Sequence, residues 1–139
     1  MDHCAPHVTL DAVDWDGSVE AHLRHIEGDT EAGIAYYRQE VKAGRKHVLG
    51  VFVEEQRFGS LVYSIQEDLG VPILMIDGLA AFPAKGACIA KYVANEWAEK
   101  MARQNGCERI RFMTRREGLK RITEGAYSPI YIMERTIAK

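Results

Sequence analysis

The sequence predicts an α/β domain of the α+β type, with a mixed sheet, a central strand, a long crossover helix and helices on both faces of the sheet. Two strand-like stretches separated by a short turn have the pattern of an antiparallel hairpin. A strand, helix, strand unit over 72–114 has the order of a right-handed crossover, which makes its two strands parallel. The first strand of that unit is apolar on both faces, so we expect helices to cover it from both sides.

Size and charge narrow the class of protein. The chain has 139 residues, 47% of them hydrophobic and 27% charged, so we expect a single domain over residues 1–139. A formal net charge of −2 gives no reason to expect non-specific binding to nucleic acid or to anionic membranes. No apolar run approaches the about 20 residues that span a bilayer, and the N-terminus lacks a basic segment followed by an apolar one. We therefore expect a cytoplasmic protein with no membrane partner.

Cysteine and histidine spacing predicts no metal site. The cysteines are odd in number and lack CxxC spacing, which argues against a disulfide framework and favours free thiols. His3 and His7 are close in sequence, and His22 and His25 share a helix face, as metal ligands sometimes do. No carboxylate or cysteine pair completes either set, so we expect surface or partly buried histidines.

The first part of the chain predicts one strand and two helices. Over 7–13, apolar and polar residues alternate, as in a half-buried strand. Behind a capping segment at Asp16, apolar residues recur at helical spacing until Gly28, which is placed to end the turn. A second helix is predicted to begin near residue 29 or 30 and to stop at Gly44.

The middle of the chain reads as three strands. Strand-forming residues are frequent over 47–66, and alternation indicates a hairpin. The predicted elements are strands over 47–54 and 58–66 with a turn at 55–57, then a loop over 67–71 and a central strand over 72–82.

A long helix dominates the last third. From about Gly86 to Gln104 one helix row contains Ile89, Val93, Trp97 and Met101, and a row of alanines beside it allows close approach to the sheet. The elements predicted to follow are a strand over 107–114, a short helix over 116–123 and a final strand over 127–137.

Two passages carry a resemblance to a known family. The central strand runs through Leu79-Ala-Ala-Phe-Pro-Ala-Lys-Gly-Ala-Cys-Ile89 into the long helix, and the last segment reads Gly125-Ala-Tyr-Ser-Pro-Ile-Tyr-Ile-Met-Glu-Arg135. With the order of elements, these passages make nearly the whole chain resemble the GNAT superfamily of N-acetyltransferases. The family's signature at the first passage is Gln/Arg-x-x-Gly-x-Gly/Ala. With Gly86 as the last small residue, Ala84 replaces the first glycine and Ala81 the Gln/Arg, so the signature is incomplete.

The resemblance implies acetyl-coenzyme A as cofactor. Backbone N–H groups at the start of the long helix would hold its pyrophosphate against the positive end of the helix dipole. We assign this role to Ala84, Lys85, Gly86 and Ala87. Backbone N–H groups of Leu79, Ala80 and Ala81 would face pantetheine and the thioester in the family manner.

A basic cluster follows the long helix. It contains Arg109, Arg111, Arg115, Arg116, Lys120 and Arg121. Arg116 is our candidate for the adenosine phosphate, although the cluster also suits an acidic protein surface or nucleic acid, or is simply solvated. The sequence contains no zinc spacing, Gly-rich RNA motif or recognition-helix pattern, so a nucleic-acid partner is not expected.

Acetyl transfer to an amine also needs a base and an acid. The family often takes the base from the central strand, where Asp77 is the one acidic residue; the alternative is a capping or bulge residue beside Gly78. Many members have a tyrosine acid at the position that Arg121 occupies here. Tyr127 or Tyr131 would substitute, with core packing as the alternative.

The resemblance therefore implies an acyl-coenzyme A dependent N-acyltransferase. Its acceptor would be an amine of a small molecule or protein, attacking directly in a ternary complex. The incomplete signature keeps open a second function: a noncatalytic interaction or assembly module of the same fold, such as a phage structural protein. That module would act through a homo-oligomer or an assembly partner.

Overall fold

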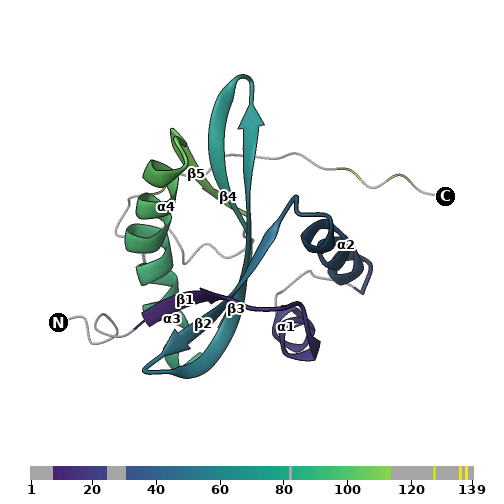
Figure 1. Ribbon diagram of the computed structural model, residues 1–139, viewed down its shortest axis with the longest axis vertical. Coiled ribbons are helices and arrows are strands. Elements are labelled where there is room, and N and C mark those ends of the chain that lie inside the picture. The colour runs from purple at the N-terminus through teal and green to yellow at the C-terminus, as the bar shows by residue number, and fades with distance from the viewer. Residues whose placement is uncertain are drawn as a thin grey trace.

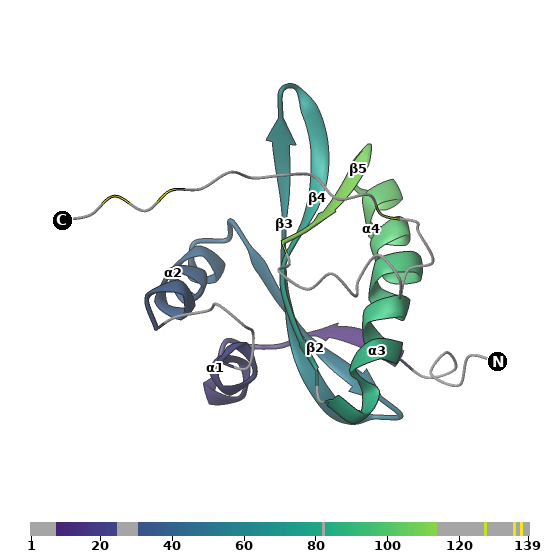
Figure 2. The same cartoon turned by 180° about the vertical axis from the view of Figure 1, so that it is seen from behind.

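The predicted mixed sheet with helices on both faces is confirmed. The computed structural model describes residues 8–24, 31–81 and 83–113, together with Tyr127, Arg135 and Ile137. Within these residues a five-stranded sheet stands between two helical layers, with α1 and α2 on one side and α3 and α4 on the other (Figure 1). From behind, α3 and α4 run as one rod along their face of the sheet (Figure 2).

The order of the strands in the sheet follows their order in the chain, β1-β2-β3-β4-β5. Neighbouring strands are antiparallel except β4 and β5, whose predicted parallel pairing is confirmed. The helices and strands are β1 (Val8–Ala12), α1 (Gly17–Leu23), α2 (Glu31–Lys42), β2 (His47–Val53), β3 (Gln56–Asp68), β4 (Val71–Ala81), α3 (Pro83–Tyr92), the π segment η2 (Val93–Trp97), α4 (Ala98–Gln104) and β5 (Arg109–Phe112).

Both hairpin turns differ from the prediction. The first turn is formed by Glu54 and Glu55, with φ angles of 50° and 70°, and not by 55–57. The loop expected over 67–71 shrinks to Leu69 and Gly70, with φ angles of 51° and 82°. Turns with two left-handed residues match the twist of the flanking strands, and they usually contain Asn or Gly. Glu54, Glu55 and Leu69 are not residues typical of such turns, so these three positions carry no such signal in the sequence.

The long helix begins earlier than predicted and changes its phase once. It starts at Pro83 and not at Gly86, because proline suits the first helical position, where an N–H has no partner in the helix. At η2 the Ala98 N–H donates to the Val93 carbonyl, five residues back. The fully or nearly fully buried side chains are Ile89, Val93, Ala94, Ala98 and Ala102, so the stripe facing the sheet passes from the Ile/Val row to the alanine row.

Two apolar clusters pack against the two faces of the sheet. The larger lies between the sheet and α3–α4 and includes Leu61, Leu74, Ile76, Ile89 and Val93. The smaller lies under α1 and α2 and consists of Val19, Leu23, Ile34, Val48 and Val62. Side chains of β4 are buried on both faces, as a sequence apolar on both faces predicted.

Several predicted segments fall at the edges of the described chain. The helix expected over 116–123 lies outside it, and so does the predicted end of the first helix near Gly28. Of the final strand expected over 127–137, the structure describes Tyr127, Arg135 and Ile137, and none of them is in a strand. Among the helices of the described part, none is both long enough and apolar enough to cross a membrane.

Candidate functional site

Strand β4 contains a bulge at Asp77. Val62 of β3 is opposite Gly78 and the next residue, Tyr63, is opposite Ile76, so Asp77 has no cross-strand partner. An extra residue of this kind bends a strand and redirects its side chains. The sequence alternative of a bulge residue beside Gly78 is therefore confirmed.

The parallel ladder between β4 and β5 ends where the bulge begins. It joins Ile73–Ile76 to Arg109–Phe112, and the Met113 N–H donates to the Ile76 carbonyl at 3.1 Å. Beyond Ile76, β4 continues to Ala81 against β3 alone among the described strands. Leu79, Ala80 and Ala81 thus occupy a stretch of β4 whose other edge pairs with no strand of the described residues.

The start of α3 lies directly after this stretch. Position 82 alone separates Ala81 from Pro83, and Ala84, Lys85, Gly86 and Ala87 all lie in the first turns of the helix. The helix was expected from about Gly86; it starts three residues earlier, at Pro83, so Ala84 and Lys85 lie within its first turn. In a helix that starts there, Ala84 and Lys85 have backbone N–H groups without intrahelical acceptors, while Pro83 has none to offer.

Three side chains converge on Asp77 from the face covered by α2. Lys46 Nζ donates to Oδ1 at 2.9 Å, and Ser64 Oγ donates to Oδ2 at 2.8 Å. Tyr37 donates its hydroxyl to the Asp77 carbonyl at 3.3 Å. The side chains of Lys46 and Asp77 are 7% and 8% exposed, so this is a buried ion pair.

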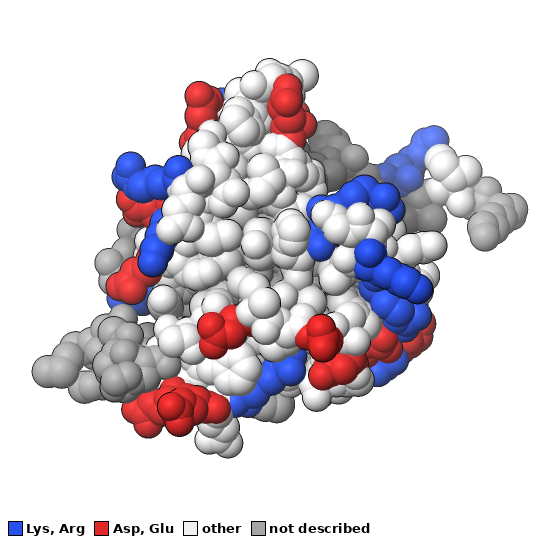
Figure 3. Space-filling view, in the orientation of Figure 1, with Lys and Arg blue, Asp and Glu red and all other residues white. Residues whose placement is uncertain are grey.

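Neighbouring groups complete this arrangement. Gln66 Nε2 donates to Ser64 Oγ at 2.9 Å, and Lys46 Nζ does so at 3.4 Å. We call Lys46, Ser64, Asp77 and Tyr37 the bulge clamp. Its outer side borders an open hollow of about 630 Å³ between α2 and the strands β2 and β3, which Lys46 and Ser64 help to line. Lys and Arg side chains gather on the α2 side of the molecule (Figure 3).

Sequence reasoning missed Lys46 and Ser64. Lys46 follows Gly44-Arg45 and reads as a solvated loop cation, and Ser64 stands at a position of β3 that the alternation of Leu61, Tyr63 and Ile65 assigned to the polar face. Because α2 covers that face, Ser64 is only 2% exposed. Its neighbour Ile65, whose side chain points to the other face, is 40% exposed. The available signal was the acid at Asp77, since a buried carboxylate needs a partner.

The other candidate that the structure describes, Tyr127, lies on the opposite face of the sheet. Its hydroxyl donates to the Ala94 carbonyl in η2 at 2.6 Å, and its ring meets Phe112 edge-on with centroids 5.5 Å apart. Burial, with a smaller contribution from the negative charge of Glu99, raises the pKa of Tyr127 to about 12. The structure does not bring Tyr127 and Asp77 together. Tyr131 and Arg116 lie outside the described residues.

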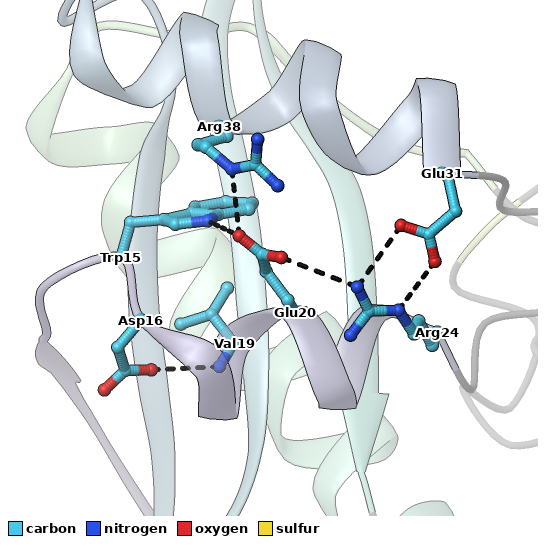
Figure 4. A network of polar contacts seen from close by, with 7 residues as sticks. All are labelled: Trp15, Asp16, Val19, Glu20, Arg24, Glu31 and Arg38. Atoms are coloured by element: carbon cyan, nitrogen blue, oxygen red, sulfur yellow. Dashed lines mark hydrogen bonds and ion pairs between the residues drawn. The ribbon is translucent and has the colours of Figure 1, made fainter.

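A second polar network fastens α1 to α2 above the clamp's face of the sheet. The Glu20 carboxylate accepts from Trp15 Nε1 at 2.7 Å and from Arg38 Nε at 2.9 Å (Figure 4). Arg24 lies 3.6 Å from Glu20 and donates to Glu31 at 2.7 Å. We call this group the Glu20 network. Arg38 holds the pKa of Glu20 below its usual value, with help from Trp15.

Comparison with known proteins identifies the fold. The sequence matches no family model and no curated protein. Among solved structures, it is similar to a ribosomal-protein-alanine N-acetyltransferase from Brucella melitensis biovar Abortus 2308, with a TM-score of 0.66 and 14% identity over 95% of this chain and 99% of that chain. It is also similar to an aminoglycoside antibiotic 6'-N-acetyltransferase from Acinetobacter haemolyticus, with a TM-score of 0.63 and 15% identity over 96% of this chain and 99% of that chain. For a transcriptional regulator from Bacillus halodurans C-125, the TM-score is 0.67 and the identity 16% over 95% of this chain and 100% of that chain.

The chain therefore has the GNAT fold, as its sequence predicted. At these identities the likeness is one of fold, and function has to be argued from the site.

Proposed function

We propose that this protein is an acyl-coenzyme A dependent N-acyltransferase that moves an acetyl group to an amine of a small molecule or protein. One observation carries the proposal: the bulge at Asp77, the stretch of β4 with one edge that no described strand covers and the start of α3 follow each other within one continuous segment. The likeness of the fold to acetyltransferases supports it.

The cofactor fits this segment in two respects. Ala84 and Lys85 offer N–H groups at the positive end of a helix, which suits a pyrophosphate. The edge of β4 at Leu79–Ala81, which no described strand covers, offers backbone groups to the amides of pantetheine. Gly86 and Ala87 keep the turn free of large side chains, and Arg116 remains our candidate for the adenosine phosphate. Bound here, acetyl-coenzyme A supplies the activated thioester.

Asp77 is our candidate for the base. Lys46 and Ser64 each donate to one of its two carboxylate oxygens, and each oxygen keeps a lone pair after accepting that hydrogen bond. That carboxylate would take a proton from the acceptor's ammonium, directly or through a water molecule, before the amine attacks the thioester carbon. Tyr127, protonated at neutral pH, and Tyr131 remain the candidates for the acid that protonates the leaving thiolate.

Calorimetric titration with acetyl-coenzyme A at moderate salt tests the proposal. We expect micromolar binding to the natural protein and none to Gly86→Glu, which places a negative side chain in the first turns of α3. Gln104→Glu adds the same charge to the exposed end of α4 and should bind like the natural protein. Absence of binding to all three proteins would overturn the proposal. Binding would justify a screen of amines, including peptide N-termini and amino sugars, because two structural neighbours are named for such acceptors.

A noncatalytic interaction or assembly module is the second candidate. Pro83 favours it, because proline removes an N–H from the helix start where a pyrophosphate would bind. One structural neighbour of the same fold is described as a transcriptional regulator. In that case the protein would act through a second copy or another protein. Light scattering across a concentration series, with and without acetyl-coenzyme A, would detect self-association.

A further inference from the structure

We propose that Lys46 is a positioning residue that acts through Asp77: it fixes the β4 bulge and holds the buried carboxylate in the orientation for proton transfer. This inference rests on the proposed acyl transfer. It assigns a role to the side chain immediately before β2, far in sequence from the cofactor segment, whose ammonium lies 2.9 Å from Asp77 Oδ1.

The geometry of the bulge requires such a residue. No residue of β3 is paired with Asp77, so the cross-strand ladder does not fix the orientation of its side chain. The bulge clamp supplies that constraint from three elements, with Tyr37 of α2 on the main-chain carbonyl and Lys46 and Ser64 on the two carboxylate oxygens. Leu79, whose backbone faces the proposed thioester, follows two residues later. A shift of the bulge would therefore move the donor groups of the site together with its base.

The charge of Lys46 is the second part of the argument. A buried ion pair gains little stability over two apolar side chains of similar volume, so its presence is poorly explained by folding alone. An ammonium holds a carboxylate oxygen by charge attraction as well as by a hydrogen bond, which a neutral side chain cannot do. Glu40 and Arg45, which line the same hollow as Lys46, are bonded to each other, and the Tyr36 ring lies 5.9 Å from Lys46 Nζ. Among the described contacts, Lys46 is thus the cation that holds Asp77 in place.

The test compares acetyl transfer by Lys46→Met, Asp77→Asn and the double variant, using an amine found in the acceptor screen. We expect Asp77→Asn to lower kcat about 100-fold, as loss of a general base does. Lys46→Met should lower kcat and leave the KM for the amine close to that of the natural protein, because the base is still present but is no longer held in its orientation. If Lys46 acts through Asp77, the double variant should be no slower than Asp77→Asn.

Two controls make the result interpretable. Lys42→Met removes an exposed lysine at the end of α2 and should leave both kcat and KM unchanged. Ser64→Ala removes one hydrogen bond to Asp77 and keeps the ion pair; it should lower kcat less than Lys46→Met and stands in for that variant should it fail to fold. Losses that multiply in the double variant, or a raised KM with an unchanged kcat in Lys46→Met, would overturn the positioning role while acyl transfer stands.

Failure of the proposed function would look different. A natural protein that binds acetyl-coenzyme A with no measurable affinity and acetylates no amine would refute acyl transfer itself. Urea unfolding of the same four proteins would then still report whether Lys46 and Asp77 are coupled, and coupling without activity would make the clamp purely structural, which also rejects a positioning role.

Discussion

The Glu20 network and the bulge clamp use similar chemistry in different surroundings. Each contains an acidic residue, a basic partner of its carboxylate and an aromatic hydrogen-bond donor. The side chains of Glu20 and Arg38 are 19% and 49% exposed, whereas those of Asp77 and Lys46 are 8% and 7% exposed. Water reaches the partners of Glu20 far more readily than those of Asp77. The comparison teaches that burial, more than the number of contacts, decides how much each pair matters.

The largest effect should follow from breaking the buried pair on one side only. Lys46→Met leaves the Asp77 carboxylate uncompensated, and we expect the free energy of unfolding to fall by about 3–5 kcal/mol in urea titrations at neutral pH. Addition of Asp77→Asn should recover much of the loss, because no charge then remains buried. Equal losses for Lys46→Met and the double variant would show that the pair is not the source of the effect.

Tyr127 is an intermediate case, half-buried and neutral. Tyr127→Phe removes the hydrogen bond to Ala94 and should lower the free energy of unfolding by about 0.5–1.5 kcal/mol. The pKa of about 12 adds a pH test against an ordinary value of 10. Because the folded state raises this pKa, its contribution is complete below pH 10 and is lost as pH rises towards 12. Alkaline unfolding curves of the natural protein and Tyr127→Phe should converge in that window.

Glu20→Gln should have a smaller effect that depends on acid and salt. The pKa of Glu20 is held below 4.5, so its contribution is present above that value and is lost as pH falls through the lowered pKa. We expect the natural protein to lose its advantage over the variant in thermal melts as pH is lowered through this range. Added salt should reduce the difference at neutral pH. A difference that persists in strong acid would contradict the assignment.

The smallest effect is expected at the most exposed pair. Arg103 and Glu99 of α4 form an i,i+4 pair with side chains 77% and 58% exposed. Arg103→Gln should change the free energy of unfolding by no more than about 0.5 kcal/mol in urea. A loss as large as that for Lys46→Met would break the relation between burial and effect.

Periodicity in the sequence predicted the fold because its cues are local. The alternation over the hairpin and the apolar run through β4 placed the strands in order, and helical spacing located α3 and α4. Turn positions were missed at Glu54-Glu55, since left-handed glutamates have no sequence signature. The π segment was missed for a similar reason: neither the Ile/Val row nor the alanine row shows where the helix changes register.

The candidate site was predictable only in part. Asp77 was found because one acid stood in an apolar strand, and its position as a bulge residue was one of two readings. Its partners could not be found, because Lys46 reaches it from the connection between α2 and β2 and its sequence neighbourhood looks solvated. The helix start at Pro83 was placed too late, although proline is typical of the first helical position.

The π segment η2 has the geometry of a single-residue insertion that the fold has absorbed in place. Along the buried stripe the spacing is four residues from Ile89 to Val93, five from Val93 to Ala98 and four again to Ala102. A chain shortened by one residue within 93–97 could close a regular α-helix there and keep the same stripe against the sheet. At an unchanged length, a regular helix would instead leave α4 rotated by about 100° against α3, the turn that one residue makes. Length and sequence are therefore coupled in this helix, and a relative with one residue fewer at η2 would align with this chain only across a gap.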